Sequence, residues 1–316
     1  MTGGSGFLGK RVIAVLGERG IPVRALARSE KADSVVRSVG AEPVRGDLGD
    51  RAAMQTGMAG CDTAFHAAAF VEEHGKLSEF MKVTVEGTQS ALDAAKAAGV
   101  TRFVHVGTEA VLADGNPIVR ADETVPLPHK PAGQYPLTKG LAEQAVIAAN
   151  SAGFETVVIR PRFIWGAGDT SLFPKLVDRV NNNSYAWVGG GHYLTSTCHV
   201  DNVVEGALLA AERGRPGEIY FLTDGEPVDF RDFLSKMFEA HGVRVPTASV
   251  PRWVAKTAAA LTSWMKNPPV TRTAIALVGG EVTVVDAKAR KELGYLGKVS
   301  RDAGLEGMRA EARASS

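Results

Sequence analysis

The chain has 316 residues, a length that suits one nucleotide-binding core with an attached lobe better than two independent domains. Its 36 Lys and Arg against 35 Asp and Glu give a formal net charge of +1, which excludes the basic excess typical of nucleic-acid-binding proteins. Cys61 and Cys198 are far apart and lack a Cys-x-x-Cys pattern, so we expect a reducing compartment and no metal site.

A glycine-rich stretch begins the chain. Gly3, Gly6 and Gly9 have the spacing Gly-x-x-Gly-x-x-Gly, and a segment of helical periodicity follows at 7–19. Such a loop lets backbone N–H groups reach a pyrophosphate at a helix N-terminus. A plain turn is the alternative, but the strand at 22–27 that comes next favours a dinucleotide site. The expected cofactor contacts here are Gly3, Ser5, Gly6, Phe7 and Leu8.

The strand that precedes this loop in a dinucleotide-binding sheet is missing. Thr2 follows Met1 directly, whereas the fold places a buried central strand ahead of the loop. We hypothesise that the true start lies upstream and that Met1 marks a Val codon read as a start. The alternative is that the short chain is real and that its sheet is poorly stable.

Short β-branched runs alternate with helical segments up to about residue 188. The runs lie at 22–27, 43–45, 63–66, 102–107 and 156–160. Such alternation indicates an α/β fold with a doubly wound parallel sheet of the Rossmann type. A helix predicted over 76–99, with Leu77 and Phe80 on its apolar face, should cover that sheet.

Two positions near the ends of strands bear on the choice of cofactor. Arg28 stands where a carboxylate would bind the ribose diol of NAD, and a guanidinium there can pair with a 2′-phosphate. NADP is therefore favoured over NAD, although a solvated surface arginine is the alternative. Asp47, followed by Leu48, can accept a hydrogen bond from the adenine amine, and a helix-capping aspartate is the competing interpretation.

Tyr135 and Lys139 are the expected catalytic pair. Their spacing of four residues at the start of a helix puts both side chains on one side. Because a free tyrosine titrates near pH 10, it needs a nearby cation to exchange protons at neutral pH, and Lys139 supplies one. An unrelated aromatic and lysine is the alternative for any single Tyr-x-x-x-Lys. The position of the Tyr135 and Lys139 pair after the glycine loop and five predicted strands favours the catalytic interpretation.

Thr108 ends the strand at 102–107, where its hydroxyl can hold the substrate oxygen beside Tyr135. A threonine that only caps the strand is the alternative. Glu109 and His105 are further candidates for acid and base, but a lone histidine on a strand is more often a packed core residue.

After Gly166 the composition changes to that of Gly- and Asn-rich loops, which predicts a smaller substrate-binding lobe. We assign residues 1–165 and 199–222 to the nucleotide-binding domain, and residues 166–198 and 223–316 to the lobe. A helix is expected at 201–211, and a polar, frayed tail from about Arg309.

These motifs together resemble the extended short-chain dehydrogenase/reductase family of the NAD-dependent epimerase/dehydratase superfamily, in the branch of 3β-hydroxysteroid dehydrogenases, sterol carboxylate dehydrogenases and dihydroflavonol-type reductases. The resemblance runs nearly end to end. It rests on residues 2–9, 46–48, 65–69, 87–88, 135–139, 160–166 and 199–203. It implies that Ala67, Ala68 and Ala69 line the cofactor and that Pro161 and Ile164 border the nicotinamide.

The resemblance also implies that Lys139 binds the nicotinamide ribose. Two residues depart from the family pattern. Thr108 replaces the more frequent serine but keeps the hydroxyl, whereas Thr84 replaces an asparagine, which puts the support of Lys139 through ordered water in doubt.

The predicted activity is hydride transfer between NADP(H) and a secondary alcohol or ketone, on a hydrophobic substrate that is sterol-like, flavonoid-like or long-chain. A nucleotide-sugar epimerase or dehydratase is the alternative enzyme. A redox sensor that binds NADP without turnover is the alternative of another class, but it should lack the Tyr135 and Lys139 pair.

The segment 250–265 has an apolar stripe that includes Val254, Ala255 and Leu261, flanked by tryptophan and lysine. It could pack on the main domain, or lie on a membrane or over a lipophilic substrate site. We therefore expect a small-molecule substrate, no nucleic acid and at most weak peripheral membrane contact. We also expect a homodimer and, because no signal sequence or membrane-spanning stretch is found, a cytoplasmic protein.

Overall fold

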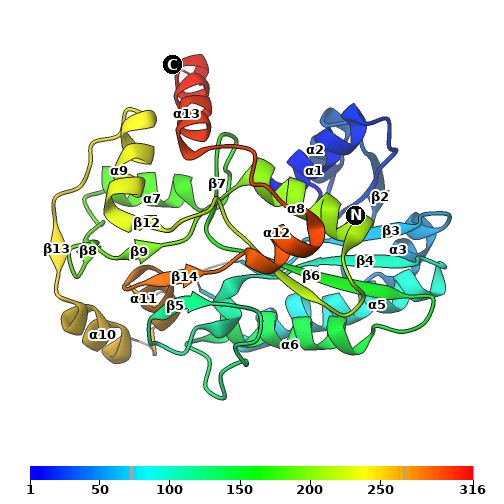
Figure 1. The fold of residues 1–316 in the computed structure, drawn as a ribbon, viewed down its shortest axis with the longest axis horizontal. Helices are drawn as coiled ribbons and strands as arrows, with labels where there is room; N and C mark the ends of the chain where they lie inside the picture. Colours follow the sequence, from blue (N-terminus) through cyan, green and yellow to red (C-terminus); the bar gives the residue numbers. More distant parts are fainter. Residues whose placement is uncertain (72–73, 263, 266–267, 269, 316) are drawn as a thin grey trace.

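The computed structural model describes residues 1–71, 74–262, 264–265, 268 and 270–315. Its main sheet has four parallel strands in the order β11–β6–β4–β3 (Figure 1). These are β3 (Thr63–His66), β4 (Arg102–Val106), β6 (Glu155–Pro161) and β11 (Ile219–Leu222). The runs predicted at 63–66, 102–107 and 156–160 are therefore strands of one sheet. Their continuous apolar character reflects burial on both faces.

A second pair of parallel strands, β1 (Arg24–Ala27) and β2 (Glu42–Arg45), lies beside the main sheet. Met1 and Thr2 connect this pair of strands to the main sheet. The Leu26 amide donates to the Met1 carbonyl at 2.8 Å, and the Thr2 amide donates to the Phe65 carbonyl at 2.9 Å. These two residues therefore lie between β1 and β3, at the place where the sequence analysis expects the central strand.

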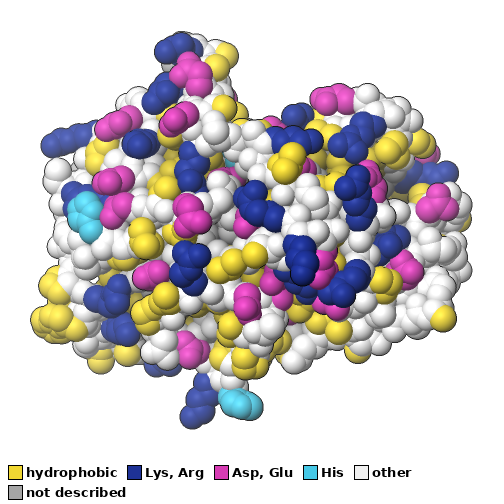
Figure 2. All heavy atoms as spheres, viewed as in Figure 1, with side chains coloured by type: hydrophobic (Ala, Val, Ile, Leu, Met, Phe, Trp, Pro, Cys, Tyr) yellow, Lys and Arg dark blue, Asp and Glu magenta, His cyan; other side chains and the backbone are white. Residues whose placement is uncertain are grey.

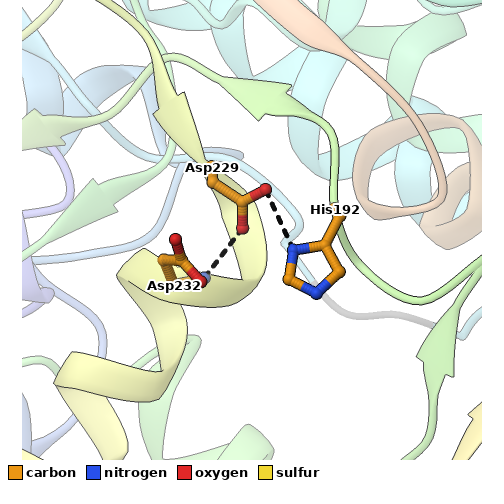
Figure 3. A group of neighbouring side chains, drawn as sticks. All are labelled: His192, Asp229 and Asp232. Carbon is orange, nitrogen blue, oxygen red and sulfur yellow. Dashed lines mark hydrogen bonds and ion pairs between the residues drawn. The ribbon is translucent and has the colours of Figure 1, made fainter.

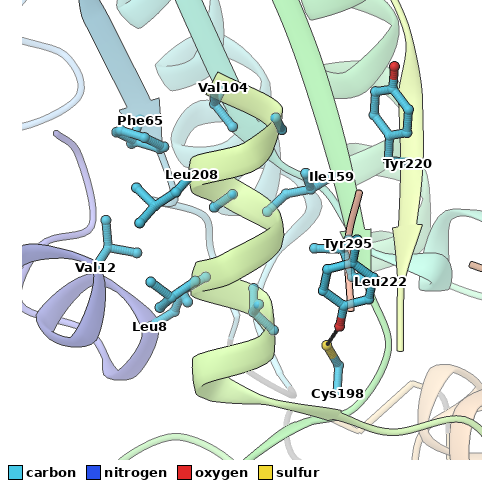
Figure 4. Close-up of a cluster of buried hydrophobic side chains, with 14 of the residues drawn as sticks. Leu8, Val12, Phe65, Val104, Ile159, Cys198, Leu208, Tyr220, Leu222 and Tyr295 are labelled. Carbon is cyan, nitrogen blue, oxygen red and sulfur yellow. Dashed lines mark hydrogen bonds between the residues drawn. The ribbon is translucent and has the colours of Figure 1, made fainter. Parts of the chain in front are cut away.

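Helices cover both faces of the main sheet (Figure 1). One face carries α1 (Phe7–Glu18), α8 (Val200–Arg213) and α12 (Ala287–Leu293), and the other carries α3 (Arg51–Met58), α5 (Gly87–Ala97) and α6 (Gln134–Ala148), while α2 (Glu30–Ser38) packs on β1. The largest core cluster lies around α8, where Leu208 belongs to the same cluster as Phe65, Val104 and Val12 (Figure 4). The predicted helix at 201–211 is thus a central part of the core.

The helix predicted over 76–99 is present but not uniform. It consists of α4 (Leu77–Phe80), the π-helix η1 (Met81–Glu86) and α5. Phe80 is buried, whereas Leu77 is 44% exposed, so the predicted apolar face is wrong at its first residue. Leu77 is the first residue of the short helix α4, before η1, whereas Thr84, Thr88 and Leu92 farther along the predicted face are buried.

The remaining elements form the lobe and its connections to the main sheet. They are η2 (Glu109–Leu112), β5 (Ile118–Ala121), β7 (Ile164–Trp165), α7 (Phe173–Asn181), β8 (Trp187–Val188), β9 (Leu194–Thr195), β10 (Cys198–His199), β12 (Val228–Asp229), α9 (Phe230–Ala240), β13 (Ser249–Val250), α10 (Arg252–Leu261), α11 (Arg272–Val278), β14 (Val282–Val284) and α13 (Arg301–Ser315). The lobe core is aromatic, with Phe163, Trp165, Trp187 and Phe230 packed together.

The C-terminal region differs from expectation. The tail from Arg309 is not frayed, because it is the last part of α13, which continues to Ser315, and Glu311 within it accepts from the Gly168 amide at 2.9 Å. Earlier in the same helix, Leu305 and Met308 are buried in the aromatic core of the lobe. Two pairs of elements also make contact across the proposed domain boundary: β5 pairs with β14, and α12 packs on α8. The division itself stays a prediction.

The view in Figure 2 shows basic and acidic side chains interspersed over one face of the molecule. Within the described residues, no helix combines the length and the apolar character needed to cross a bilayer.

Candidate active site

Tyr135 is the second residue of α6 and lies against η2, which follows β4. Gly133 precedes the helix, and a Cβ at this position would collide with Thr273 of α11, so the close approach requires glycine. Burial raises the pKa of the Tyr135 phenol to about 12, with a further increase from the Glu109 carboxylate, while the hydrogen bond to the Thr108 side chain acts in the opposite direction. The phenol is therefore protonated at neutral pH.

Lys139 is 3% exposed, and its Nζ donates to the Val106 carbonyl at the end of β4 at 2.7 Å. Burial lowers the pKa of Lys139 to about 8, and the Glu143 carboxylate opposes that decrease. The sequence analysis expects Lys139 to ease ionisation of Tyr135. In the structure, burial and Glu109 have the larger effect on the phenol, and they act in the other direction.

Thr108 has two roles in the local structure. Its hydroxyl accepts a hydrogen bond from the Ala110 amide at 3.2 Å, which caps η2, and donates to Glu109 Oε2 at 2.9 Å. Thr108 therefore caps the 3-10 helix η2, whereas the alternative predicted from the sequence is a cap of the strand. The hydroxyl also faces the phenol of Tyr135, so capping fixes the position of a group that can act on substrate.

Sequence reasoning missed the partner of Glu109. Its Oε1 accepts from Arg162 Nη1 at 3.0 Å, and both side chains are almost fully buried. The signal was present in the Arg-Pro-Arg run at 160–162, because arginine in a buried strand requires a carboxylate partner. Arg160 also has a carboxylate partner, because its Nε and Nη2 donate to the two oxygens of Glu143 at 2.8 and 2.5 Å.

The glycine loop forms a tight backbone turn. Gly3 has φ +73°, and a Cβ there would lie 2.8 Å from backbone atoms of Ala67 and Ala68. A Cβ on Gly9 would collide with the Gly3 carbonyl. Gly6 is the N-cap of α1 and provides no side-chain cap, so the helix start offers backbone N–H groups and the positive end of its dipole. These features fit the pyrophosphate of a dinucleotide.

The other residues predicted to contact the cofactor around this loop differ in their burial. Ser5 is exposed, whereas Phe7 and Leu8 are both 8% exposed and pack into the core around α8. Only the backbone N–H groups of these two residues are therefore suited to phosphate binding, because their side chains point into the core.

A buried chain of hydrogen bonds attaches the loop to the sheet. Thr2 Oγ1 lies 2.8 Å from His66 Nδ1, and His66 Nε2 lies 3.0 Å from Thr88 Oγ1. Because the Thr88 hydroxyl donates to the Thr84 carbonyl at 2.6 Å, His66 must donate from Nε2 and accept from Thr2 at Nδ1. Burial lowers the pKa of His66 to about 3, which keeps this imidazole neutral.

The residues expected near the adenosine lie at the ends of β1 and β2. Arg28 is exposed directly after β1, and within the described residues no ion-pair partner is found for it. Asp47 is exposed and accepts from the Gly49 amide at 2.7 Å, whereas Asp50 caps α3. The helix-capping interpretation of Asp47 is therefore wrong. Leu48 packs against Gly87 of α5.

The residues expected near the nicotinamide follow β3 and end β6. Ala67, Ala68 and Ala69 are half-buried after β3. Pro161 is buried at the end of β6, and Ile164 is half-buried in β7. These segments, the glycine loop and Lys139 all lie at the carboxyl ends of parallel strands, which is where open α/β sheets bind ligands.

Thr84 and His105 do not extend the catalytic group. The Thr84 hydroxyl accepts from the Phe70 amide at 3.1 Å, away from the Lys139 amine, which binds Val106 instead. His105 is buried and stacks on His66, and burial lowers its pKa well below the usual range. A neutral packed histidine agrees with the core interpretation.

A small group of side chains has spacing that would suit a metal ion. His192, Asp229 and Asp232 lie together at the start of α9 (Figure 3). One Asp229 oxygen accepts from the Asp232 amide at 2.9 Å as the helix cap, and the other lies 3.2 Å from His192 Nδ1. Helix capping therefore accounts for this arrangement.

The chain is similar over most of its length to known oxidoreductases. A model of the 3-beta hydroxysteroid dehydrogenase/isomerase family matches residues 1–252. A 4-hydroxy-2-methyl-3-oxo-4-farnesyl-3,4-dihydroquinoline-1-oxide ketoreductase of Stigmatella aurantiaca is 50% identical, over 98% of this chain and 95% of the relative. A decarboxylating sterol-4-alpha-carboxylate 3-dehydrogenase of Dictyostelium discoideum is 32% identical, over 97% of this chain and 98% of the relative.

A solved structure has the same fold. The dTDP-glucose 4,6-dehydratase DesIV from Streptomyces venezuelae, with NAD and TYD bound, gives a TM-score of 0.78 at 24% identity and covers 99% of this chain and 96% of that chain. The predicted Rossmann-type fold with a doubly wound parallel sheet is thereby confirmed.

Proposed function

Because the chain belongs to the 3-beta hydroxysteroid dehydrogenase/isomerase family of extended short-chain dehydrogenases, we propose that it reduces a ketone on a large hydrophobic molecule with NADPH as the preferred reductant. The family assignment confirms the predicted resemblance. It also confirms that the protein is an NAD(P)-dependent oxidoreductase acting at a CH–OH or keto carbon. The substrate, the direction and the choice of NADPH are our proposals.

The observation that carries the proposal is the arrangement of Thr108, Tyr135 and Lys139 at the end of β4, beside the glycine loop. When bound, the nicotinamide supplies the hydride to the carbonyl carbon. Tyr135 donates its proton to the carbonyl oxygen, and Thr108 holds that oxygen in place. A phenol that is protonated at neutral pH suits donation to a ketone better than removal of a proton from an alcohol.

The substrate class rests on two observations. The relative at 50% identity is named as a ketoreductase of a farnesylated quinoline oxide, and the relative at 32% as a sterol dehydrogenase. In this chain, α11 touches the start of the catalytic helix at Thr273 and Ala132, and α10 packs on α11. Exposed apolar residues on α10 therefore lie on the side of the lobe from which a hydrophobic substrate could approach Tyr135.

NADPH oxidation with a panel of prenylated, sterol and long-chain ketones, beside nucleotide sugars, tests this function. We expect turnover of hydrophobic ketones, and Tyr135→Phe should lower kcat by about 100-fold or more while NADPH affinity stays nearly unchanged, because only the proton donor is removed. Lys139→Ala should lower both kcat and the affinity for NADPH. Turnover confined to nucleotide sugars would move the enzyme to the epimerase or dehydratase alternative, and NADPH binding without any turnover would indicate a sensor.

A further inference from the structure

The Thr108 hydroxyl, the Glu109 carboxylate and the Arg162 guanidinium form a continuous buried chain. Thr108 donates to Glu109 Oε2 at 2.9 Å, and Arg162 Nη1 donates to Glu109 Oε1 at 3.0 Å. The exposed fractions of the three residues are 8%, 2% and 4%, so solvent screens these contacts little.

Arg162 continues the chain into the lobe. Its Nη2 donates to Thr195 Oγ1 in β9 at 3.2 Å and to the Leu277 carbonyl in α11 at 2.7 Å. One arginine therefore joins the segment after β6, a lobe strand and the helix that touches the start of α6. A shift of α11 on substrate binding would be transmitted through Arg162 to Glu109 and Thr108.

The backbone next to Arg162 is held in an unusual conformation. Phe163 has φ +45°, which is costly for a bulky residue because its Cβ approaches the following carbonyl. The Cys198 amide donates to the Phe163 carbonyl at 3.2 Å, and the Phe163 ring packs against Phe230 and Phe233. Strain that persists against this cost is commonly found at functional sites, and here it directs the chain away from the main sheet immediately after Arg162.

We propose that Glu109 and Arg162 are positioning residues for the reaction: Glu109 fixes the Thr108 hydroxyl beside Tyr135, and Arg162 anchors Glu109 to the substrate lobe. This inference rests on the proposed reductase function and adds two residues to it. With its proton directed to Glu109 and one lone pair accepting from the Ala110 amide, Thr108 keeps its other lone pair free toward the phenol. It turns its proton to the substrate oxygen when that oxygen becomes negative.

The pair also sets the charge that Tyr135 experiences. The charged and titratable groups around the site are Glu109 on η2, Arg162 after β6, Lys139 and Glu143 on α6, and the neutral His66 and His105 on β3 and β4. Among them, Glu109 is the charge that raises the pKa of Tyr135. Arg162 is the ion-pair partner of that carboxylate, at 3.0 Å.

Glu109→Gln tests the pair. The amide has one acceptor where the carboxylate has two, so it cannot satisfy both Thr108 and Arg162, and it removes the negative charge beside Tyr135. We expect kcat for ketone reduction to fall about 10- to 100-fold with little change in NADPH affinity. Because the phenol loses a negative neighbour, its pKa should fall by about one pH unit. The part of the pH profile of reduction that reports the phenol, above the decline caused by Lys139 near pH 8, should shift by the same amount.

The chain provides a matched control in a second Thr–acid–Arg group. Asp286 is 8% exposed and accepts from Thr223 Oγ1 at 2.7 Å and from Arg290 Nε at 2.9 Å, among residues packed around β11 and α12. Asp286→Asn should lower the melting temperature while the pH profile of reduction stays at its wild-type position. Arg162→Lys keeps the positive charge and should also leave the pH profile in place, while KM rises because the contacts to Thr195 and Leu277 are lost.

A readout without substrate separates this inference from the proposed function. The difference in tyrosinate absorbance between each protein and its Tyr135→Phe derivative reports the ionisation of Tyr135 alone. A lower phenol pKa in Glu109→Gln supports the pair even if no ketone is turned over, in which case only the reductase proposal fails. A wild-type phenol pKa in Glu109→Gln, or an equal shift in Asp286→Asn, would overturn the inference.

Discussion

Arg28 is the residue on which the choice between the two nicotinamide cofactors depends. It is exposed directly after β1, and within the described residues no ion-pair partner is found for its guanidinium. A charge-assisted pair with a 2′-phosphate should make Arg28→Ala weaken NADP binding by about 10 to 100-fold and leave NAD binding unchanged.

Fluorescence titration with both cofactors measures this effect. Arg37→Ala is the control, because Arg37 is an exposed arginine in the last turn of α2, at the other end of the helix that follows Arg28. A wild-type protein that binds NAD more tightly than NADP would show that Arg28 is a solvated surface residue.

Lys139 connects stability to pH. Burial lowers its pKa to about 8, against 10.5 for an ordinary lysine, so the unfolded chain binds more protons between these two values. Stability should therefore rise as the pH increases from about 8 to 10.5. The destabilisation from burying the charge, about 3 kcal/mol, is fully present below pH 8 and is lost above 10.5.

Denaturant unfolding of wild type and Lys139→Met at several pH values measures this contribution. The advantage of Lys139→Met over wild type should be largest near pH 7 and should shrink as the pH approaches 10.5. A difference that does not vary with pH would show that Lys139 has the same pKa in the folded and unfolded chain, as a solvated lysine would.

At the residue scale, the sequence predicted the groups that carry chemistry better than the contacts between them. Tyr135, Lys139 and Thr108 follow from a short spacing and from strand ends, and the structure brings them together. The Glu109–Arg162 pair did not follow, because the two residues are 53 positions apart and only the folded chain puts them within hydrogen-bond distance. The roles of all these residues stay predictions until they are tested.

The helix α10 has an unusual distribution of apolar side chains. Trp253, Leu261 and Trp264 beyond its end are 70%, 69% and 83% exposed, whereas Ala255 and Ala259 pack on α11. Leu261 of the predicted apolar stripe therefore faces solvent, whereas Ala255 is buried. Figure 2 shows hydrophobic side chains gathered at the position of α10, with basic side chains beside them.

The charge around α10 has one sign. Residues 241–280 contain no Asp or Glu, and their basic residues are Arg244, Arg252, Lys256, Lys266 and Arg272, of which Lys266 lies outside the described residues. Tryptophan side chains prefer the interface of a bilayer, and each basic residue near an anionic surface contributes about 1 kcal/mol. We propose weak contact between this helix and an anionic membrane.

Sedimentation with vesicles tests this contact. We expect binding to vesicles that contain phosphatidylserine, weakened by salt and lost in Trp253→Ala/Trp264→Ala and in Lys256→Glu/Lys266→Glu. Leu296→Ala is the control, since Leu296 is also 61% exposed but lies after α12. Equal binding to neutral vesicles would contradict the electrostatic part, and no binding at low salt would contradict the contact altogether.

Elements were predicted well where local pattern and tertiary burial agree. The strands β3 and β4 and the helix α8 follow from β-branched runs and from apolar residues three and four positions apart. The π-helix η1 and the ordered end of α13 did not follow. The former depends on packing against α6, and the latter on Leu305 and Met308 finding an aromatic core formed by residues far away in the sequence.

The main four-stranded sheet and the β1–β2 sheet differ in how much buried core supports them. β4 and β6 lie inside the largest core clusters, whereas β1, β2 and α2 share a small cluster of Ile13, Ala25, Ala27, Val36 and Ala41. Few buried contacts and few hydrogen bonds attach the β1–β2 region to the rest. We expect its amides to exchange with solvent deuterium at least about tenfold faster than those of β4 and β6.

Native-state hydrogen exchange by mass spectrometry, with and without NADPH, measures the difference. Since Gly3 packs on Ala67 and Ala68 after β3 and Gly4 packs on Ala25 of β1, a dinucleotide bound at this loop should slow exchange in β1 and β2 more than in β4. Uniform exchange across all six strands would show that the two sheets open together.

The two-residue connection between the sheets also bears on how the protein melts. The β1–β2 region also contacts α3 and Ile13 of α1, but its own core is small. We expect it to unfold before the main sheet, so the van't Hoff enthalpy from a thermal scan should be smaller than the calorimetric enthalpy. A saturating dinucleotide, bound across both regions, should bring the two enthalpies together. A melting temperature measured without cofactor would then describe only the less stable region, and ligand screens based on that temperature would respond to dinucleotides far more strongly than to ketones that bind only in the lobe.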